Sequence, residues 1–217
     1  MSASFLDDAY APQRSMIISQ AELTAREGIT MQKGMNFRDS GPLLSVLLVL
    51  SRKNGFHDVW QSDSRVYIYQ GHDSVTVEEG ALRDQVLMYE GGRLSDNGKF
   101  YKAAEAYKNG LRKEPLQTQL YEKLDFGVWY DKGIFNLVDA ACEQEDGRRE
   151  YNFSLVPCGK TDDERMMAAA AKTESWRASG GRCGVCSSEE DLYFVPTPVG
   201  LQLLCGIHGG KGTQGIL

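Results

Sequence analysis

The sequence predicts an α+β fold: a twisted, barrel-like β-sheet with flanking helices, followed by a small cysteine-containing module. Three observations lead to this prediction. Short runs rich in β-branched and aromatic residues recur along the chain and are separated by turn residues. Helix signatures with their own start and stop residues lie between some of these runs. Three of the five cysteines and one of the three histidines gather after residue 182.

Length and composition narrow the class of protein. The 217 residues suffice for one core of about 150 residues with a small appendage. A net charge of −6 gives no support to wholesale nucleic-acid binding, although it leaves room for a local basic face. No secretory leader is visible, and the longest apolar run, residues 43–50, is too short to span a bilayer. We therefore expect an intracellular protein of the cytoplasm or nucleoid, with no membrane partner.

The first elements are a helix and two strands. Residues 1–14 are expected to form a loose arm. Residues 19–28 form a predicted helix because Ser19 and Glu22 have capping-box spacing and Gly28 can end it. The apolar run at residues 43–50 predicts a buried strand, and residues 66–69 (VYIY) predict a second one.

A long connection at residues 74–96 leads to an amphipathic helix that ends near Gly110. Its apolar face repeats at helical spacing and consists of Phe100, Ala103, Ala104 and Tyr107. Three lysines lie elsewhere on this helix: Lys99, Lys102 and Lys108. They could form an ordinary solvated face or contact DNA phosphates, and the sequence leaves both interpretations open.

The rest of the large domain has the pattern of strands and turns. Strands are predicted at residues 119–124, 127–130, 134–140 and 151–156. Turns are predicted at residues 131–133 (DKG) and 146–147 (DG). A linker follows, and then a short helix at residues 165–176, which contains an alanine run.

The C-terminal cysteines have the spacing of metal ligands. A CxxC pair, Cys183 and Cys186, is followed after eighteen residues by a CxxH pair, Cys205 and His208. Two such pairs can close around one tetrahedral zinc ion with three thiolates and one imidazole. With four protein ligands the site would be closed, so we expect a structural Zn²⁺ that holds together a module too small to have its own core. The remaining cysteines, at 142 and 158, have no partner spacing.

Around these ligands the sequence reads WRASGGRCGVCSSEEDLYFVPTPVGLQLLCGIHGGKG. It resembles the ββα-metal module of HNH nucleases, with matches at Trp176, residues 181–186, residues 201–205, His208 and Lys211. The family's Asp-His pair, which supplies a metal ligand and the general base, is missing from the strand LYFVP, and Gly209 replaces the later Asn or His. Hydrolysis needs a base near the water and an open metal position. We therefore expect no catalytic residue here and interpret the module as non-cleaving.

Several pieces of residues 43–156 follow one another in a recognisable order. The run LLSVLLVLS precedes the aromatic and acidic loop GFHDVWQSD, and then come YIYQGHD, the pair DQ at 84–85, NGKF with two alanines, and VWYDKGIFNLVDA. In this order they resemble the SRA (YDG) domain, a PUA-like reader of modified cytosine, as it occurs before HNH modules in bacterial modification-dependent restriction enzymes. The resemblance implies a PUA/SRA-like twisted barrel that binds double-stranded DNA carrying a modified base.

The resemblance also implies a mechanism. SRA domains flip the modified base out of the duplex, stack it between two aromatic rings and read its polar edge with an acidic residue. Here Phe56 matches the first aromatic residue, Tyr69 the second and Asp58 the acid. Three further residues could adjust the pocket to the modification: Trp60, Gln70 and His72. Without the resemblance, the three aromatic residues could equally be core side chains.

The sequence thus predicts four parts: an N-terminal arm and helix (1–42), an SRA-like domain (43–158), a linker helix (159–179) and an HNH-like zinc module (180–217). The leading hypothesis is a reader of a modified base with a non-cleaving module. Two alternatives stay open: an active modification-dependent endonuclease, and a protein-interaction module stabilised by zinc. A homodimer is compatible with any of the three.

Overall fold

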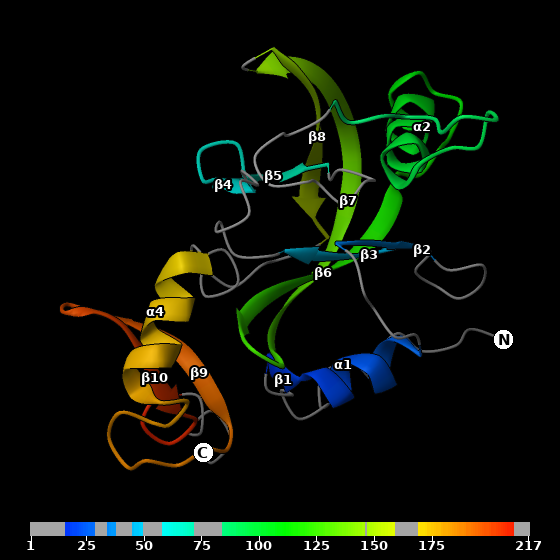
Figure 1. The fold of residues 1–217 in the computed structure, drawn as a ribbon. Coiled ribbons are helices and arrows are strands. Elements are labelled where there is room, and N and C mark those ends of the chain that lie inside the picture. The colour runs from blue at the N-terminus through cyan, green and yellow to red at the C-terminus, as the bar shows by residue number, and fades with distance from the viewer. Residues whose placement is uncertain are drawn as a thin grey trace, which may run out of the picture.

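The α+β prediction is confirmed (Figure 1). The structure is a computed structural model that describes residues 16–28, 34–37, 45–49, 58–71, 84–145, 147–158 and 169–210. The described strands of the main sheet are β1 Ile17–Ser19, β2 Met35–Phe37, β3 Ser45–Val49, β4 Val59–Gln61, β5 Val66–Gln70, β6 Leu116–Asp125, β7 Val128–Glu145 and β8 Arg148–Pro157. The helices are α1 Gln20–Glu27, α2 Asp96–Lys108 and α4 Ala169–Ser179, and a separate hairpin comprises β9 Leu192–Thr197 and β10 Gly200–Cys205.

The main sheet has eight strands in the order β2-β3-β6-β7-β8-β5-β4, and β1 pairs with β7 off this path. The pairing of β3 with β6 is parallel and the other pairings are antiparallel. The long strands β6, β7 and β8 form a continuous meander, and β7 is shared between the upper and lower parts of the molecule (Figure 1).

The turn predicted at residues 131–133 is wrong, because these residues form a β-bulge inside the single long strand β7. Leu120 pairs with Gly133 while Tyr121 pairs with Asp131, so Lys132 is the extra residue. The Asp131 side chain accepts a hydrogen bond from the Gly133 N–H at 2.8 Å, and Gly133 has a φ of +89°. An Asp-Lys-Gly sequence suits a bulge as well as a turn, because both can use a glycine at positive φ.

The N-terminal segment belongs to the main sheet. The predicted helix is confirmed as α1, with a capping box between Ser19 and Glu22 and a left-handed Gly28 at its end. Strand β1 pairs with β7, and β2 pairs with β3. The predicted boundary at residue 42 therefore separates strands of one sheet, whereas the arm at residues 1–14 lies outside the described residues.

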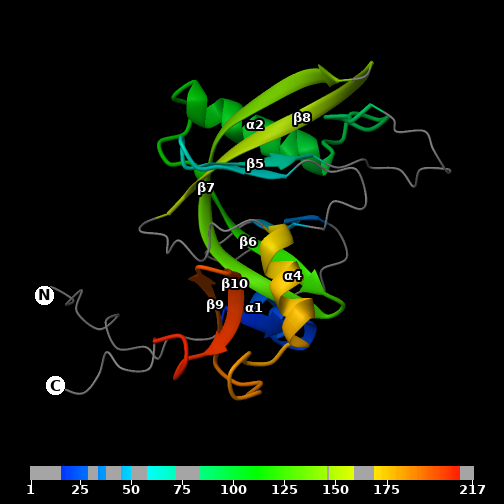
Figure 2. The ribbon, with the colours of Figure 1, turned by 90° about the vertical axis from the view of Figure 1, so that its left-hand side faces the viewer.

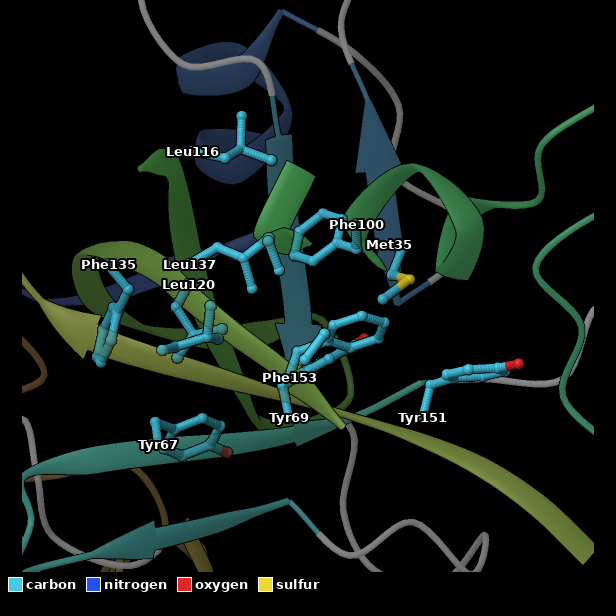
Figure 3. Packing of buried hydrophobic residues seen from close by; sticks show 13 residues of the cluster. Met35, Tyr67, Tyr69, Phe100, Leu116, Leu120, Phe135, Leu137, Tyr151 and Phe153 are labelled. Carbon is cyan, nitrogen blue, oxygen red and sulfur yellow. The ribbon is translucent and has the colours of Figure 1, made fainter. Parts of the chain in front are cut away.

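Buried hydrophobic residues form three clusters among the described residues, and two of them bear on the site. The larger one lies between the sheet and α2, where Phe100 packs edge-on against Phe153 with ring centroids 5.4 Å apart (Figure 3). The second joins the lower end of β6 and β7 to the C-terminal hairpin, and Tyr130 meets Phe194 at 5.8 Å. The C-terminal module therefore completes its core with residues of the main sheet. Among the described helices, none is long and apolar enough to cross a membrane.

Candidate nucleic-acid interface and metal centre

The β4–β5 hairpin gathers one carboxylate and three aromatic rings on one face. Trp60 pairs directly with Tyr67 across the hairpin. Because side chains alternate along strands, Tyr69 shares this face, and Asp58, two residues before Trp60, continues it. Tyr67 and Tyr69 are each 3% exposed, so the face is turned toward the protein interior. The hairpin thus presents an acid beside aromatic side chains, as the resemblance implies.

Asp58 is held by the backbone of the neighbouring strand. Its Oδ1 accepts a hydrogen bond from the Gln70 N–H at 2.9 Å. Desolvation raises the pKa of Asp58 to about 7; the Gln70 N–H opposes this rise, and the negative charge of Glu122 adds to it. Burial of the carboxylate and its hydrogen bond with the Gln70 backbone therefore define its environment.

Tyr69 lies next to this carboxylate but inside the core. Burial raises the pKa of Tyr69 far above its usual value, and the Asp58 charge raises it further, which shows that the two groups are close. The ring belongs to the larger hydrophobic cluster, among Phe153 and its neighbours (Figure 3). Trp60 is half-buried and packs against the same cluster. In this conformation Tyr69 therefore has a covered face, and Trp60 is the more accessible ring.

Among the other predicted pocket residues, Gln70 is described, and its side chain is not brought to this face. The Gln70 side chain points to the opposite side of β5, where its Nε2 donates to Glu150, and Glu150 in turn pairs with Arg148 at 2.8 Å. Gln70 thus offers Asp58 its backbone and not its amide. Phe56 and His72 lie outside the described residues.

The end of β5 is closed by a tight network around Gly71. The Gln85 side chain donates to the Gly71 carbonyl and accepts from the Tyr151 N–H at 2.8 Å. A Cβ atom on Gly71 would lie 2.7 Å from the side-chain oxygens of both Asn97 and Gln85, so no other residue fits here without movement. The DQ and NG pieces of the sequence therefore meet at the strand end that holds Asp58. Their role is to fix the backbone of the site.

The three predicted phosphate-contacting lysines all lie on α2. Lys99 pairs with Asp96 at 2.9 Å and lies over the Phe37 ring, while Lys108 pairs with Asp139 at 2.8 Å. Lys102 is exposed. Exposed ion pairs of this kind contribute little to stability, so a DNA phosphate could replace the carboxylate partners of these lysines. Contact with DNA through these lysines remains a prediction.

The four predicted metal ligands converge at the C-terminus. The ligand atoms of Cys183, Cys186, Cys205 and His208 all lie within 4.8 Å of one another. The Cys186 and Cys205 sulfurs are 3.7 Å apart, and the His208 Nδ1 is 3.3 Å from Cys205 Sγ and 3.5 Å from Cys183 Sγ. Zinc–sulfur bonds of about 2.3 Å in a tetrahedron require sulfur separations of roughly 3.7 Å, so the set fits this ion.

Local backbone groups prepare this site for a cation. Burial acts to raise the pKa of Cys183, but N–H groups of Cys205, Cys186 and Val185 outweigh it and bring the pKa to about 5. The thiolate, which is the form that binds metal, therefore predominates at neutral pH. Gly206 is needed next to the second ligand pair, because a Cβ there would lie 2.2 Å from an Asp191 carboxylate oxygen. The arrangement supports a bound metal ion with four protein ligands.

Sequence reasoning missed one buried group of charges: Glu122 forms ion pairs with both Lys132 and Lys172, and all three are almost fully buried. In sequence these charged residues look like solvent-facing positions of strands and of a helix. Tertiary packing, including that of α4 against β6, buries them.

No protein-family model matches the sequence, and no curated protein matches it. Among solved structures, the fold is similar to the SRA domain of SUVH5 bound to fully hydroxymethylated CG DNA, with a TM-score of 0.49, 14% identity, and coverage of 70% of this chain and 95% of that chain. The structure of KRYPTONITE in complex with mCHH DNA has a TM-score of 0.48 and 12% identity. The match covers 71% of this chain and 33% of that chain. The structure of a modification-dependent TagI restriction endonuclease has a TM-score of 0.46 and 14% identity. The match covers 95% of this chain and 79% of that chain. All three TM-scores are below 0.5, so the functional argument is made from the residues of this chain.

Proposed function

We propose that this protein binds double-stranded DNA and reads a modified base that is flipped out of the duplex and presented to Asp58. The observation that carries the proposal is the state of the Asp58 carboxylate. It is desolvated, accepts a hydrogen bond from the Gln70 N–H, and lies on the same hairpin face as Trp60 and Tyr69. A perturbed carboxyl group of this kind is typical of a binding or catalytic site.

The chemistry of a flipped base matches this carboxylate. A base outside the duplex loses its pairing and needs new hydrogen-bond partners for its Watson–Crick edge. Carboxylate oxygens accept from the exocyclic amine of cytosine, and the residues of this hairpin resemble the reader of modified cytosine. Asp58 would accept a hydrogen bond from the exocyclic amine of the flipped base.

The aromatic side chains supply the stacking that the base loses. We propose the sandwich implied by the resemblance, formed by Phe56 and Tyr69, with Trp60 beside it. Stacking of a base on an aromatic ring is worth about 1–3 kcal/mol. Because the Tyr69 ring is now 3% exposed, entry of the base requires the side chains that cover this ring to move.

We further propose that the metal-bound module has a structural role and does not cut DNA. Its hairpin, β9–β10, packs against Leu124 and Tyr130 of the main sheet. The one histidine in its described part, His208, lies among the metal ligands. Incubation of a modified plasmid with the protein and Mg²⁺ or Mn²⁺ tests this proposal, because cleavage that a chelator removes would contradict it.

The experiment for the reader function compares duplexes that differ in a single base. Fluorescence anisotropy would measure the affinity for duplexes with cytosine, 5-methylcytosine or 5-hydroxymethylcytosine at one site. We expect the intact protein to prefer a modified duplex. Asp58→Asn should reduce this preference about 10- to 100-fold, because a charge-assisted hydrogen bond contributes about 1.5–3 kcal/mol.

A second variant separates base reading from backbone contact. Lys102→Ala should weaken binding to modified and unmodified duplexes equally and lower the salt dependence, because a phosphate contact carries no sequence information. Equal affinity of the intact protein for all three duplexes would refute the reader function. If both Asp58→Asn and Asp58→Ala keep the preference for the modified duplex, the modified base is recognised by other residues.

A further inference from the structure

In chain order, a small hairpin lies between β5 and α2. It consists of residues 88–94, and its two end residues form an antiparallel bridge. The Tyr89 N–H donates to the Arg93 carbonyl at 2.9 Å, and the Gly92 N–H donates to the Tyr89 carbonyl at 3.1 Å. Gly91 and Gly92 close the turn with φ values of +89° and +80°, a conformation that other residues rarely adopt. The backbone of this 88–94 hairpin is therefore hydrogen-bonded on both sides of a tight turn.

The hairpin is joined to the start of α2 through Ser95. The Ser95 N–H donates to the Leu87 carbonyl at 2.9 Å, and its hydroxyl donates to the Val86 carbonyl at 2.5 Å. The same hydroxyl accepts from the Gly98 N–H at 2.9 Å, as the N-cap of α2. One side chain thus ties the hairpin to the first turn of the helix.

The other end of the hairpin is joined to the recognition face. Gln85, three residues before the hairpin, donates from its side chain to the Gly71 carbonyl and accepts from the Tyr151 N–H at 2.8 Å. Gly71 directly follows Gln70, whose N–H donates to Asp58 at 2.9 Å. A short path of bonded groups therefore connects the hairpin with the Asp58 carboxylate. Both ribbon views show α2 and β5 in the same part of the molecule, away from the β9–β10 hairpin (Figures 1 and 2).

The surface of the 88–94 hairpin carries an arginine stacked over an aromatic ring. The Arg93 guanidinium carbon lies 5.1 Å from the centroid of the Tyr89 ring. Arg93 is exposed and Tyr89 is half-buried. Among the residues that the structure describes, Arg93 has no carboxylate partner. A guanidinium held in this way keeps its N–H groups for an outside acceptor, and its planar fork matches two oxygens of a phosphate.

The stretch of chain around Arg93 is basic although the whole protein is acidic. Residues 88–113 contain six basic and three acidic residues, whereas the net charge of the protein is −6. Several of the other basic residues lie on α2, and Lys99 and Lys102 are exposed there. Glu90, exposed at the turn of the hairpin, opposes an anion at this position. A local excess of positive charge beside a recognition face is typical of a surface that contacts DNA phosphates.

We propose that the 88–94 hairpin is a contact to the DNA backbone, in which Arg93, oriented by the Tyr89 ring, binds a phosphate of the duplex whose base is presented to Asp58. The inference rests on the DNA binding of the proposed function and adds a contact outside the three lysines of α2. A phosphate contact carries no sequence information. Arg93 therefore contributes affinity and places the duplex, whereas Asp58 selects the base.

Fluorescence anisotropy with the full chain and zinc, between about 50 and 200 mM NaCl, tests this assignment on duplexes with cytosine or 5-methylcytosine at one site. Arg93→Gln should weaken binding to both duplexes about tenfold, because a charge-assisted contact is lost. It should also lower the slope of log affinity against log salt by about 1. The ratio of the two affinities should stay the same. Glu90→Gln should strengthen binding to both duplexes, because it removes a negative charge beside the phosphate.

Two matched comparisons separate the contact from other effects. Tyr89→Phe keeps the ring under the guanidinium and should retain more affinity than Tyr89→Leu, which keeps the arginine charge and loses the stack. Arg177→Gln removes the same charge from an exposed position on α4 and should leave affinity and salt slope unchanged. Circular dichroism and the melting temperature confirm that each variant is folded.

An unchanged affinity and salt slope in Arg93→Gln would overturn the proposal. An equal loss in Arg177→Gln would do the same, since net charge would then explain the effect, and so would a loss confined to the modified duplex. If the intact protein binds both duplexes equally, the reader function fails, whereas the hairpin contact stands when Arg93→Gln weakens that binding. No binding of the intact protein to either duplex overturns both.

Discussion

Asp58→Asn should stabilise the protein at neutral and alkaline pH while it weakens the preference for a modified base. The pKa of this carboxyl is raised from 3.8 to about 7 in the folded protein. The folded state thus binds the proton more tightly than the unfolded state does. The contribution of Asp58 to stability is fully present below pH 3.8 and is lost as the pH rises through 7. An amide cannot ionise, so it avoids this loss.

The magnitude follows from the size of the pKa rise. At about 1.36 kcal/mol per pKa unit, the ionised carboxylate lowers stability by roughly 4 kcal/mol above pH 7. Asp58 is only half-buried as a residue, and the new amide donors of asparagine need partners of their own. We therefore expect Asp58→Asn to gain about 2–3 kcal/mol at pH 8 and close to nothing at pH 4.

Urea unfolding of the two proteins at pH 4, 6 and 8, with zinc present throughout, measures this gain. The difference between variant and parent cancels the pH dependence of metal binding, which both share. Asp63→Asn, on the exposed turn between β4 and β5, is the matched control and should show no gain. A gain that is the same at all three pH values, or a loss of stability at pH 8, would refute the assignment of Asp58 as a desolvated carboxylate.

Three further predictions concern the frame of the site. Removal of metal by a chelator, or Cys186→Ser, should release about one zinc ion per chain and lower the melting temperature, because the β9–β10 hairpin shares its core with the main sheet; elemental analysis and calorimetry measure this. In denaturant titrations, Gly98→Ala should destabilise the fold more than Gly71→Ala. A Cβ at residue 98 would lie 1.9 Å from the backbone carbonyl oxygen of Leu87, which cannot move aside, whereas a Cβ at Gly71 would lie 2.7 Å from side-chain atoms. Ser19→Ala should reduce stability by about 1 kcal/mol in the same assay through loss of the α1 cap.

Local pattern was enough to predict many elements. The spacing of Ser19 and Glu22 predicts the capping box that α1 has, because capping depends on residues three positions apart. Alternation and β-branched content predict β5, and the CxxC and CxxH pairs predict the convergence of four ligand atoms. In each case the interaction is short in sequence, or its geometry is imposed by the chemistry of a tetrahedral ion.

Local pattern failed where two distant segments compete for the same residues. The sequence at residues 131–133 permits a turn or a bulge, and the pairing of β7 with β6 selects the bulge. Gln70 was expected in the pocket, but the period of the strand turns its side chain toward Glu150 on β8. The bulge cannot be predicted without the neighbouring strand, whereas strand alternation by itself places Gln70 on the face opposite Tyr69.

The recognition hairpin shows the same division. Composition and order alone place an acid and aromatic residues next to each other at residues 56–69. The tertiary structure alone decides that Asp58 is desolvated and that Tyr69 lies in the core. It also brings Lys172, fifty residues along the chain from Glu122, into a buried contact 3.0 Å long. Burial and charge environment are properties of the packed chain, because they depend on every element that excludes water from a group and not on the group's neighbours in sequence.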